Sequence, residues 1–258
     1  MRTAPNTYIL NLAFSDMIYL NVHFSEACAN KSFVTWLDDF MCKFFPFFRR
    51  LSVGLTAYSI ALLSIQRYRV TVNSLHVRVS SQPTWRSTLA TICGVWILAI
   101  LYAPPSALSK YLCHVSIILE HITYYEHVVI LEILVSCVIP LCVIAFSFIK
   151  TARHLVAISC SVPEGTQNPQ MNTRKNTVKI VTALTFVFLI SCVPYHSFWV
   201  YFVSTTGPYK AANKIIVKEE YSLQYTYLVS SCLLLINSCL KPVALFCTSL
   251  AFRRQLKR

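Results

Sequence analysis

Long apolar runs alternate with short polar segments along this chain, and each run is close to the length that an α-helix needs to cross a bilayer. The polar segments 152–172 and 204–221 are expected to be loops, because they are rich in turn-forming or charged residues. The pattern predicts an all-α membrane protein with one helical bundle over residues 1–258. The expected spans cover approximately residues 5–28, 42–68, 87–108, 125–151, 174–203 and 222–247.

The span from Cys42 to Tyr68 organises the prediction. Cys42 and Arg67 are 25 residues apart, which is a rise of about 37 Å in an α-helix. That rise is close to the thickness of a bilayer with its headgroups. One helix would therefore place Cys42 at one face, where a cysteine can be cross-linked, and Arg67 at the other, where it can meet cytoplasmic partners.

Composition and charge agree with a membrane protein. The chain is 55% hydrophobic and 13% charged, whereas a soluble domain carries about a quarter charged residues. The net charge of +13 does not indicate nucleic acid binding, because the basic residues lie in short clusters between apolar runs. No HExxH, Gly-rich phosphate loop, G-x-S-x-G or CxxC motif occurs, so we expect no enzyme activity, cofactor or metal site.

The distribution of charge also predicts orientation. Fourteen of the 23 Lys and Arg residues fall on one side of the predicted bilayer, opposed there only by Glu164. The positive-inside rule makes that side cytoplasmic. Because six spans return the chain to its starting side, both ends of the given chain are expected to be cytoplasmic.

Two motifs relate the chain to a known family. The span that begins at Cys42 ends in Gln66-Arg67-Tyr68, and the last span contains Asn237-Ser238-Cys239-Leu240-Lys241-Pro242. The chain resembles the rhodopsin-like (class A) G-protein-coupled receptors. The segments Cys42-Lys43, Pro46-Phe47 and Ser52-Val53-Gly54 are most similar to the endothelin and bombesin receptors.

The resemblance implies a plasma-membrane receptor bundle with helices two to seven present, and a short amphipathic helix starting near Phe252. The opening residues look like the family's first cytoplasmic loop, so the first helix is expected to be missing from this chain. The implied function is to pass the signal of an extracellular peptide to a heterotrimeric G protein. The alternative is a truncated or degenerate receptor that does not signal. A transporter or channel is a third choice, but the chain shows no internal repeat.

The resemblance implies several features of the outer side. Cys42 is expected to form a disulfide with Cys113, the alternative being two lone thiols. Asn30 heads a glycosylation sequon close to the membrane. Arg49 stands where amine receptors carry an aspartate, which argues against an amine ligand.

The expected ligand pocket lies between the outer halves of the helices. Arg49 and Arg50 invite an anionic group of the ligand, such as a peptide carboxylate. The alternative is that Glu132 pairs with them internally. Tyr195 and His196 are weaker pocket candidates.

At the cytoplasmic side, the resemblance assigns G-protein coupling to Arg67, Tyr68 and Leu75. Gln66 replaces the acid that holds the arginine in the resting state, so we expect raised basal activity. Other switch positions also depart from the family, with Cys192 in place of a tryptophan, and Phe148 and Leu245 in place of tyrosines. The kink and switch positions that follow the family pattern are Pro140, Phe188, Pro194 and Pro242.

Lys241 is the most informative departure, because the family has Asn or Asp there, beside a sodium ion held by the acid of helix two. Asp16 is that acid here, since Asn11 to Asp16 resembles helix two. We expect a buried salt bridge between Asp16 and Lys241, which makes the receptor insensitive to sodium. The alternative is that Lys241 extends toward cytoplasmic water. The matching polar set also contains Thr56, Asn237 and Ser238.

Overall fold

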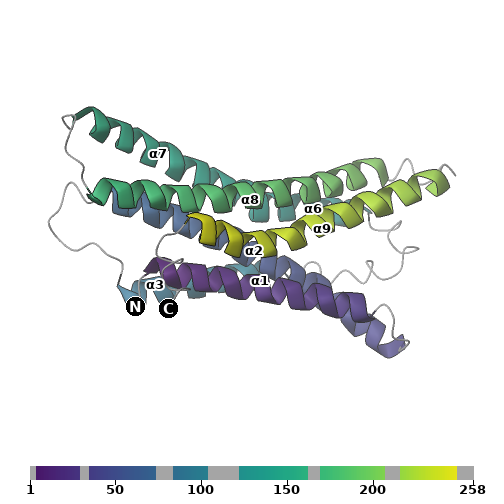
Figure 1. The fold of residues 1–258 in the computed structure, drawn as a ribbon. Coiled ribbons are helices and arrows are strands. Elements are labelled where there is room, and N and C mark those ends of the chain that lie inside the picture. Colours follow the sequence, from purple (N-terminus) through teal and green to yellow (C-terminus); the bar gives the residue numbers. More distant parts are fainter. Residues whose placement is uncertain are drawn as a thin grey trace.

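The computed structural model describes residues 4–29, 35–73, 84–103, 122–161, 169–206 and 216–248. Within these ranges the chain is helical except for the capping residues Thr84 and Ala103, which confirms the expected all-α fold (Figure 1). The helices are α1 (Ala4–Ala29), α2 (Thr35–Asn73), α3 (Trp85–Tyr102), α6 (Ile122–Ile133), the π-helix η2 (Leu134–Val138), α7 (Ile139–Ser161), α8 (Pro169–Thr206) and α9 (Ile216–Thr248).

Several helices are longer than the apolar runs that predicted them. The prediction of a loop over residues 152–172 is wrong at both ends, because α7 continues to Ser161 and α8 begins at Pro169. The loop over 204–221 is wrong in the same way, since α9 already begins at Ile216. A helix satisfies its own backbone hydrogen bonds, so it can continue into water where the side chains become polar.

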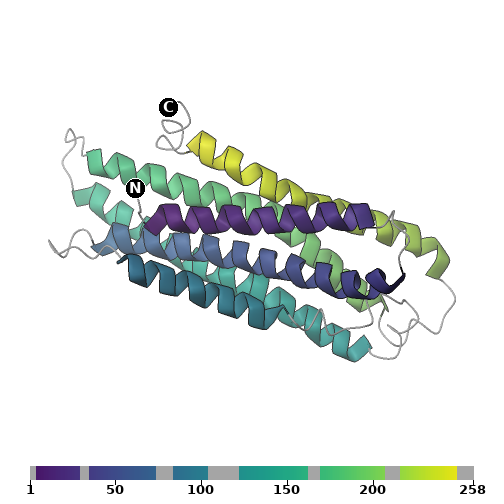
Figure 2. The same cartoon turned by 90° about the horizontal axis from the view of Figure 1, so that it is seen from below.

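The helices form one elongated bundle in which α2 is central (Figures 1 and 2). It packs against α1, α3, α7, η2 and α8, and α8 packs along most of α9. α1 begins and α9 ends at the same end of the bundle (Figure 2). We call this the inner end, and the opposite end, where α2 begins, the outer end.

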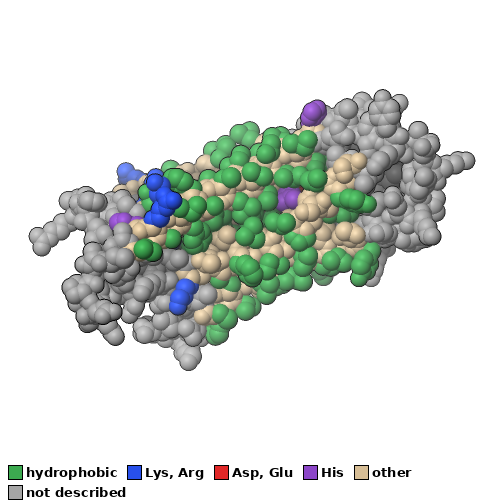
Figure 3. Space-filling model, turned by 90° about the horizontal axis from the view of Figure 1, so that it is seen from above, with side chains coloured by type: hydrophobic (Ala, Val, Ile, Leu, Met, Phe, Trp, Pro, Cys, Tyr) green, Lys and Arg blue, Asp and Glu red, His purple; other side chains and the backbone are tan. Residues whose placement is uncertain are grey.

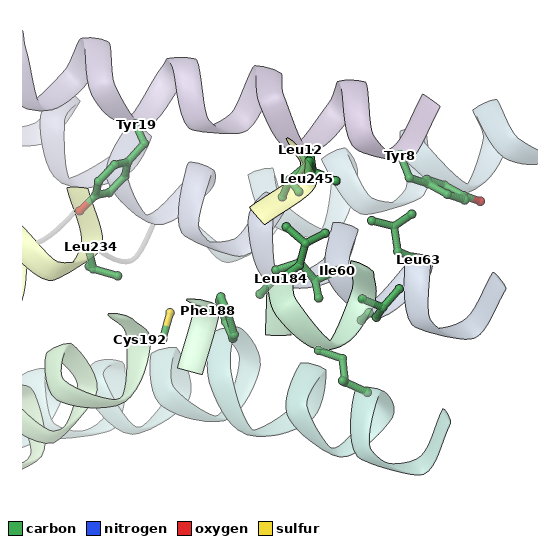
Figure 4. Close-up of a cluster of buried hydrophobic side chains, with 14 of the residues drawn as sticks. Tyr8, Leu12, Tyr19, Ile60, Leu63, Leu184, Phe188, Cys192, Leu234 and Leu245 are labelled. Carbon is green, nitrogen blue, oxygen red and sulfur yellow. The ribbon is translucent and has the colours of Figure 1, made fainter. Parts of the chain in front are cut away.

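The main core cluster consists of apolar side chains from five helices, α1, α2, α7, α8 and α9 (Figure 4). Leu12 of α1, Ile60 of α2 and Phe188 of α8 are almost fully buried in it. Leu245 of α9, at a position where the family has a tyrosine, also packs into this cluster. These contacts bring α1, α2, α8 and α9 together around the middle of the bundle.

The outside of the bundle is largely apolar as well. Leu10 and Phe24 of α1, Leu101 of α3 and Phe186 of α8 are each more than 60% exposed, as expected for side chains that face lipid. Apolar side chains cover the middle of the face shown in Figure 3, and the Lys and Arg side chains visible there gather near one end. Among the described residues, four helical segments are long and apolar enough to cross a membrane: Trp85–Tyr102, His127–His154, Lys179–Tyr201 and Leu228–Cys247.

Candidate functional site

A buried ion pair joins the first helix to the last. Lys241 Nζ of α9 lies 2.5 Å from Asp16 Oδ1 of α1. Lys241 is only 1% exposed, so its amine does not extend toward the inner end of the bundle. The structure therefore favours the internal pair over the alternative in which Lys241 reaches cytoplasmic water.

Hydroxyl groups complete the surroundings of this pair. Ser238 Oγ donates to Asp16 Oδ1 at 3.1 Å, and Lys241 Nζ also donates to Thr56 Oγ1 of α2 at 3.3 Å. Thr56 and Ser15 are within hydrogen-bond distance of each other, at 3.0 Å. Three helices thus contribute to one polar cluster, which we call the inner cluster: Ser15, Asp16, Thr56, Ser238 and Lys241.

A small cavity lies beside the inner cluster. Asp16, Thr56, Cys192 and Asn237 contribute to its lining, and its volume is about 10 Å³, which is room for one water molecule at most. Asn237 Oδ1 is buried and has no hydrogen-bond partner among the described residues. One water molecule in the cavity would supply that oxygen with a donor.

A second polar connection, which the sequence did not predict, crosses three neighbouring helices. Trp96 Nε1 of α3 donates to Asn11 Oδ1 of α1 at 2.9 Å. Asn11 Nδ2 in turn donates to Ser59 Oγ of α2 at 2.8 Å. The only sequence signal was an amide and an indole N–H inside apolar spans, where polar groups need a partner.

The outer half of the bundle holds another ion pair. Arg50 of α2 lies 2.8 Å from Glu132 of α6, and their side chains are 11% and 8% exposed. Of the two arrangements that the sequence left open for Arg50, the structure has the internal pair with Glu132. The adjacent Arg49 is buried as well.

The remaining pocket candidates lie next to this outer pair. His196 Nε2 of α8 is 3.4 Å from Ser136 Oγ, and Ser136 Oγ donates to the carbonyl of Glu132 at 2.6 Å. His196 Nδ1 is buried without a hydrogen-bond partner among the described residues. The Tyr195 ring is also buried and stands edge-on to His196, with 5.5 Å between ring centroids. We call Arg50, Glu132, Ser136 and His196 the outer cluster.

The outer cluster sits on an irregular stretch of helix. In η2, Ile139 N–H bonds to the carbonyl of Leu134, five residues earlier, so the stretch carries one extra residue per turn. Pro140 follows directly and lacks the N–H that a regular helix would use there. Tyr58 of α2 donates its hydroxyl to the carbonyl of Val135 at 2.9 Å, which satisfies a backbone group within the π-helix.

At the inner end, Arg67 and Tyr68 of α2 are half-buried, and Gln66 is buried with its Oε1 unpartnered among the described residues. Arg67 lines a cavity of about 10 Å³ together with Ser64, Phe148 and Thr151. Phe148 offers no hydroxyl to this cavity. Leu75 lies outside the described residues, so the structure says nothing of its position.

The switch positions in the middle of the bundle fall on α7, α8 and α9. Phe188 and Cys192 lie in the core (Figure 4). The Cys192 side chain is smaller than the tryptophan that is usual at this position. Pro140 is fully buried, whereas Pro194 and Pro242 lie inside long helices that continue past them. The expected disulfide and glycosylation site cannot be placed, because the side chain of Cys42, and all of Cys113 and Asn30, lie outside the described residues.

Comparisons with known proteins cover the whole chain. A family model for "7 transmembrane receptor (rhodopsin family)" matches residues 1–244. The neuropeptide CCHamide-1 receptor of Drosophila melanogaster is 32% identical over 100% of this chain and 54% of its own length. The [Phe13]-bombesin receptor of Bombina orientalis is 28% identical over 100% of this chain and 68% of its own length. The chain thus spans about half the length of the first relative and two thirds of the second.

Proposed function

The chain belongs to the rhodopsin family of seven-transmembrane receptors, and on that premise we propose that it senses an extracellular peptide and activates a heterotrimeric G protein. The observation that carries the proposal is the similarity of the whole chain to two receptors whose names specify peptides. An enzymatic function is not proposed, because the family consists of receptors. Nothing in the fold or the comparisons favours the non-signalling alternative.

We assign ligand contact to the outer cluster. It lies among the outer halves of α2, α6 and α8, and it contains the ion pair of Arg50 with Glu132. An acidic group of a peptide could form a bidentate contact with the Arg50 guanidinium, but only by displacing the Glu132 carboxylate. Glu132 therefore acts as an internal competitor for an anionic ligand.

Signalling is assigned to Arg67 and Tyr68 at the inner end of α2. Gln66 is neutral and buried, so it cannot hold Arg67 by an ion pair as an acid would. We propose that the resting state is correspondingly less favoured and that basal activity is raised. The many basic residues at the inner end support a cytoplasmic orientation of that end in the plasma membrane.

The primary test is a G-protein activation assay in cells that express the full chain, with surface expression measured in parallel. The ligands are pairs of peptides of identical sequence with a free or an amidated C-terminus. We expect saturable, dose-dependent activation by a peptide, and its loss in Arg67→Ala with ligand binding retained. Specific binding without any G-protein activation would instead support the non-signalling alternative, and the absence of peptide binding would contradict the proposal.

The charge of the ligand is tested at Glu132 with the same peptide pairs. Glu132→Gln frees Arg50 from its competitor, so it should raise the potency of the free-acid peptide relative to the amidated one. Arg50→Gln should have the opposite effect. If neither variant changes the ratio of the two potencies, Arg50 does not contact an anionic group of the ligand.

Basal activity is tested at Gln66. Gln66→Asp should lower basal signalling, because a carboxylate can pair with Arg67. Gln66→Asn is the matched control, since it has the same size as Asp without the charge, and it should leave basal signalling high. Equal basal signalling in both variants would count against the weakened resting state.

A further inference from the structure

The carboxylate of Asp16 is enclosed by helices in the middle of the bundle, where an isolated charge is strongly unfavourable. Such a carboxylate needs a positive partner, which is either a cation bound from solution or a basic side chain of the protein. The family resemblance implies a bound sodium ion at this place. The surroundings of Asp16 decide which partner this chain uses.

The Lys241 ammonium already occupies the position that a cation would take. It lies 2.5 Å from Asp16 Oδ1 and 3.3 Å from Thr56 Oγ1, so it is bound by a carboxylate and a hydroxyl. Ser238 donates to the same carboxylate oxygen. That oxygen therefore already accepts two hydrogen bonds.

The remaining space does not fit a second cation. The adjacent cavity of about 10 Å³ holds one water molecule at most. Its unpartnered acceptor is Asn237 Oδ1, and one neutral oxygen is a poor substitute for a carboxylate. A sodium ion added to the neutral Asp16–Lys241 pair would also leave one uncompensated positive charge inside the bundle, close to the ammonium.

We infer that the Lys241 ammonium is a built-in replacement for the solution cation at Asp16, and that this bundle binds no sodium there. The replacement has a consequence that a free ion does not have. The ammonium is covalently part of α9, so it neutralises Asp16 at any ion concentration. If α9 moves away from α1, the two charges separate and each is left buried without its counter-charge. The pair therefore holds these two helices together.

The first experiment needs no variant, ligand or G protein, so its failure is separate from a failure of the proposed function. The purified full chain is unfolded thermally in detergent, in NaCl and in choline chloride at equal ionic strength. We expect the same Tm in both salts at every concentration. A Tm that rises with sodium but not with choline would overturn the inference.

The second experiment creates the site that the lysine fills. Lys241→Asn removes the ammonium and leaves Asp16 without a positive partner, so the variant should gain a sodium-dependent rise in Tm, of about 3–5 °C once sodium is tenfold above its Kd. The matched control is the double variant Asp16→Asn with Lys241→Asn, which should show no sodium dependence. A Lys241→Asn protein that folds and ignores sodium would show that the ammonium does not stand in for a cation.

Discussion

The described part of the bundle contains two buried ion pairs, and their surroundings differ. The inner pair, Asp16 with Lys241, is supplemented by hydroxyl groups from α2 and α9, and its lysine is almost completely enclosed. The outer pair, Arg50 with Glu132, sits beside a π-helix and a histidine whose Nδ1 lacks a partner among the described residues. Each pair has one unpartnered polar atom nearby, Asn237 Oδ1 at the inner pair and His196 Nδ1 at the outer pair, but hydroxyl groups bond directly to both charges of the inner pair.

This difference indicates different roles. A buried charge with several hydrogen bonds is difficult to move, because leaving its position breaks each of them. The inner pair therefore fixes α1 and α9 relative to each other. The outer pair has an irregular helix on one side and an incompletely bonded His196 on the other, so it can exchange partners at smaller cost. That property suits a site that must respond to a ligand.

The largest effect is expected from breaking the inner pair on one side. Asp16→Asn leaves the Lys241 ammonium buried without its counter-charge, which should destabilise the protein by about 3–5 kcal/mol. Thermal unfolding of the purified protein would measure the loss. The control combines Asp16→Asn with Lys241→Met, which removes both charges and should recover most of the stability. A double variant as unstable as the single one would mean that the pair is not what Asp16→Asn disrupts.

A smaller effect is expected at the outer pair. Arg50→Gln leaves Glu132 with His196 and Ser136 as neighbours, so we expect a loss of about 1–3 kcal/mol, below that of Asp16→Asn. Arg50→Gln combined with Glu132→Gln is the matched control, and it should restore part of the loss. The comparison of the two pairs fails if Arg50→Gln destabilises the protein more than Asp16→Asn does.

The smallest effect concerns the hydrogen bond that supports the π-helix. Tyr58→Phe removes only the hydroxyl that donates to the carbonyl of Val135, so the expected loss is about 1 kcal/mol. Because η2 carries Ser136 of the outer cluster, Tyr58→Phe should shift peptide potency while Tm stays independent of sodium. Thr91→Val is a suitable control, since the Thr91 hydroxyl also donates to one backbone carbonyl, at 2.8 Å, but in α3 and away from η2. Equal effects of both variants on potency would remove the special role of the π-helix.

The sequence allowed the inner pair to be predicted because ionisable side chains are rare inside apolar spans. Asp16 and Lys241 are 225 residues apart, yet each needs a partner of opposite charge, and the helix order brings their spans together. For Arg50 the same reasoning left two partners, a ligand group or Glu132. Only the packing of α2 against η2, which brings Arg50 to Glu132, could decide between them.

The π-helix and the helix ends could not be predicted from the local sequence. A π-helix has no distinctive composition, so Pro140 predicted a kink but not the extra residue in the turn before it. The ends of α7, α8 and α9 were predicted wrongly because hydropathy indicates where the side chains are apolar. It does not indicate where the hydrogen-bonded helix ends. For a related reason α1 and α2 are not among the four segments apolar enough to cross a membrane. They carry Asn11, Asp16, Arg49 and Arg50, whose polar groups face the bundle interior.

The sequence separation of the inner pair has a consequence for biosynthesis. At a translation rate of about 5–20 residues per second, Asp16 is made roughly 10–45 s before Lys241. During that interval the nascent chain holds an acid in its first helix without the base that will neutralise it, so the acid must stay hydrated, protonated or shielded by the insertion machinery. Chains that stop before residue 216 should therefore be degraded faster than the same chains with Asp16→Asn, which a pulse-chase experiment would measure. The charge balance of α1 is therefore completed only when α9 has been made.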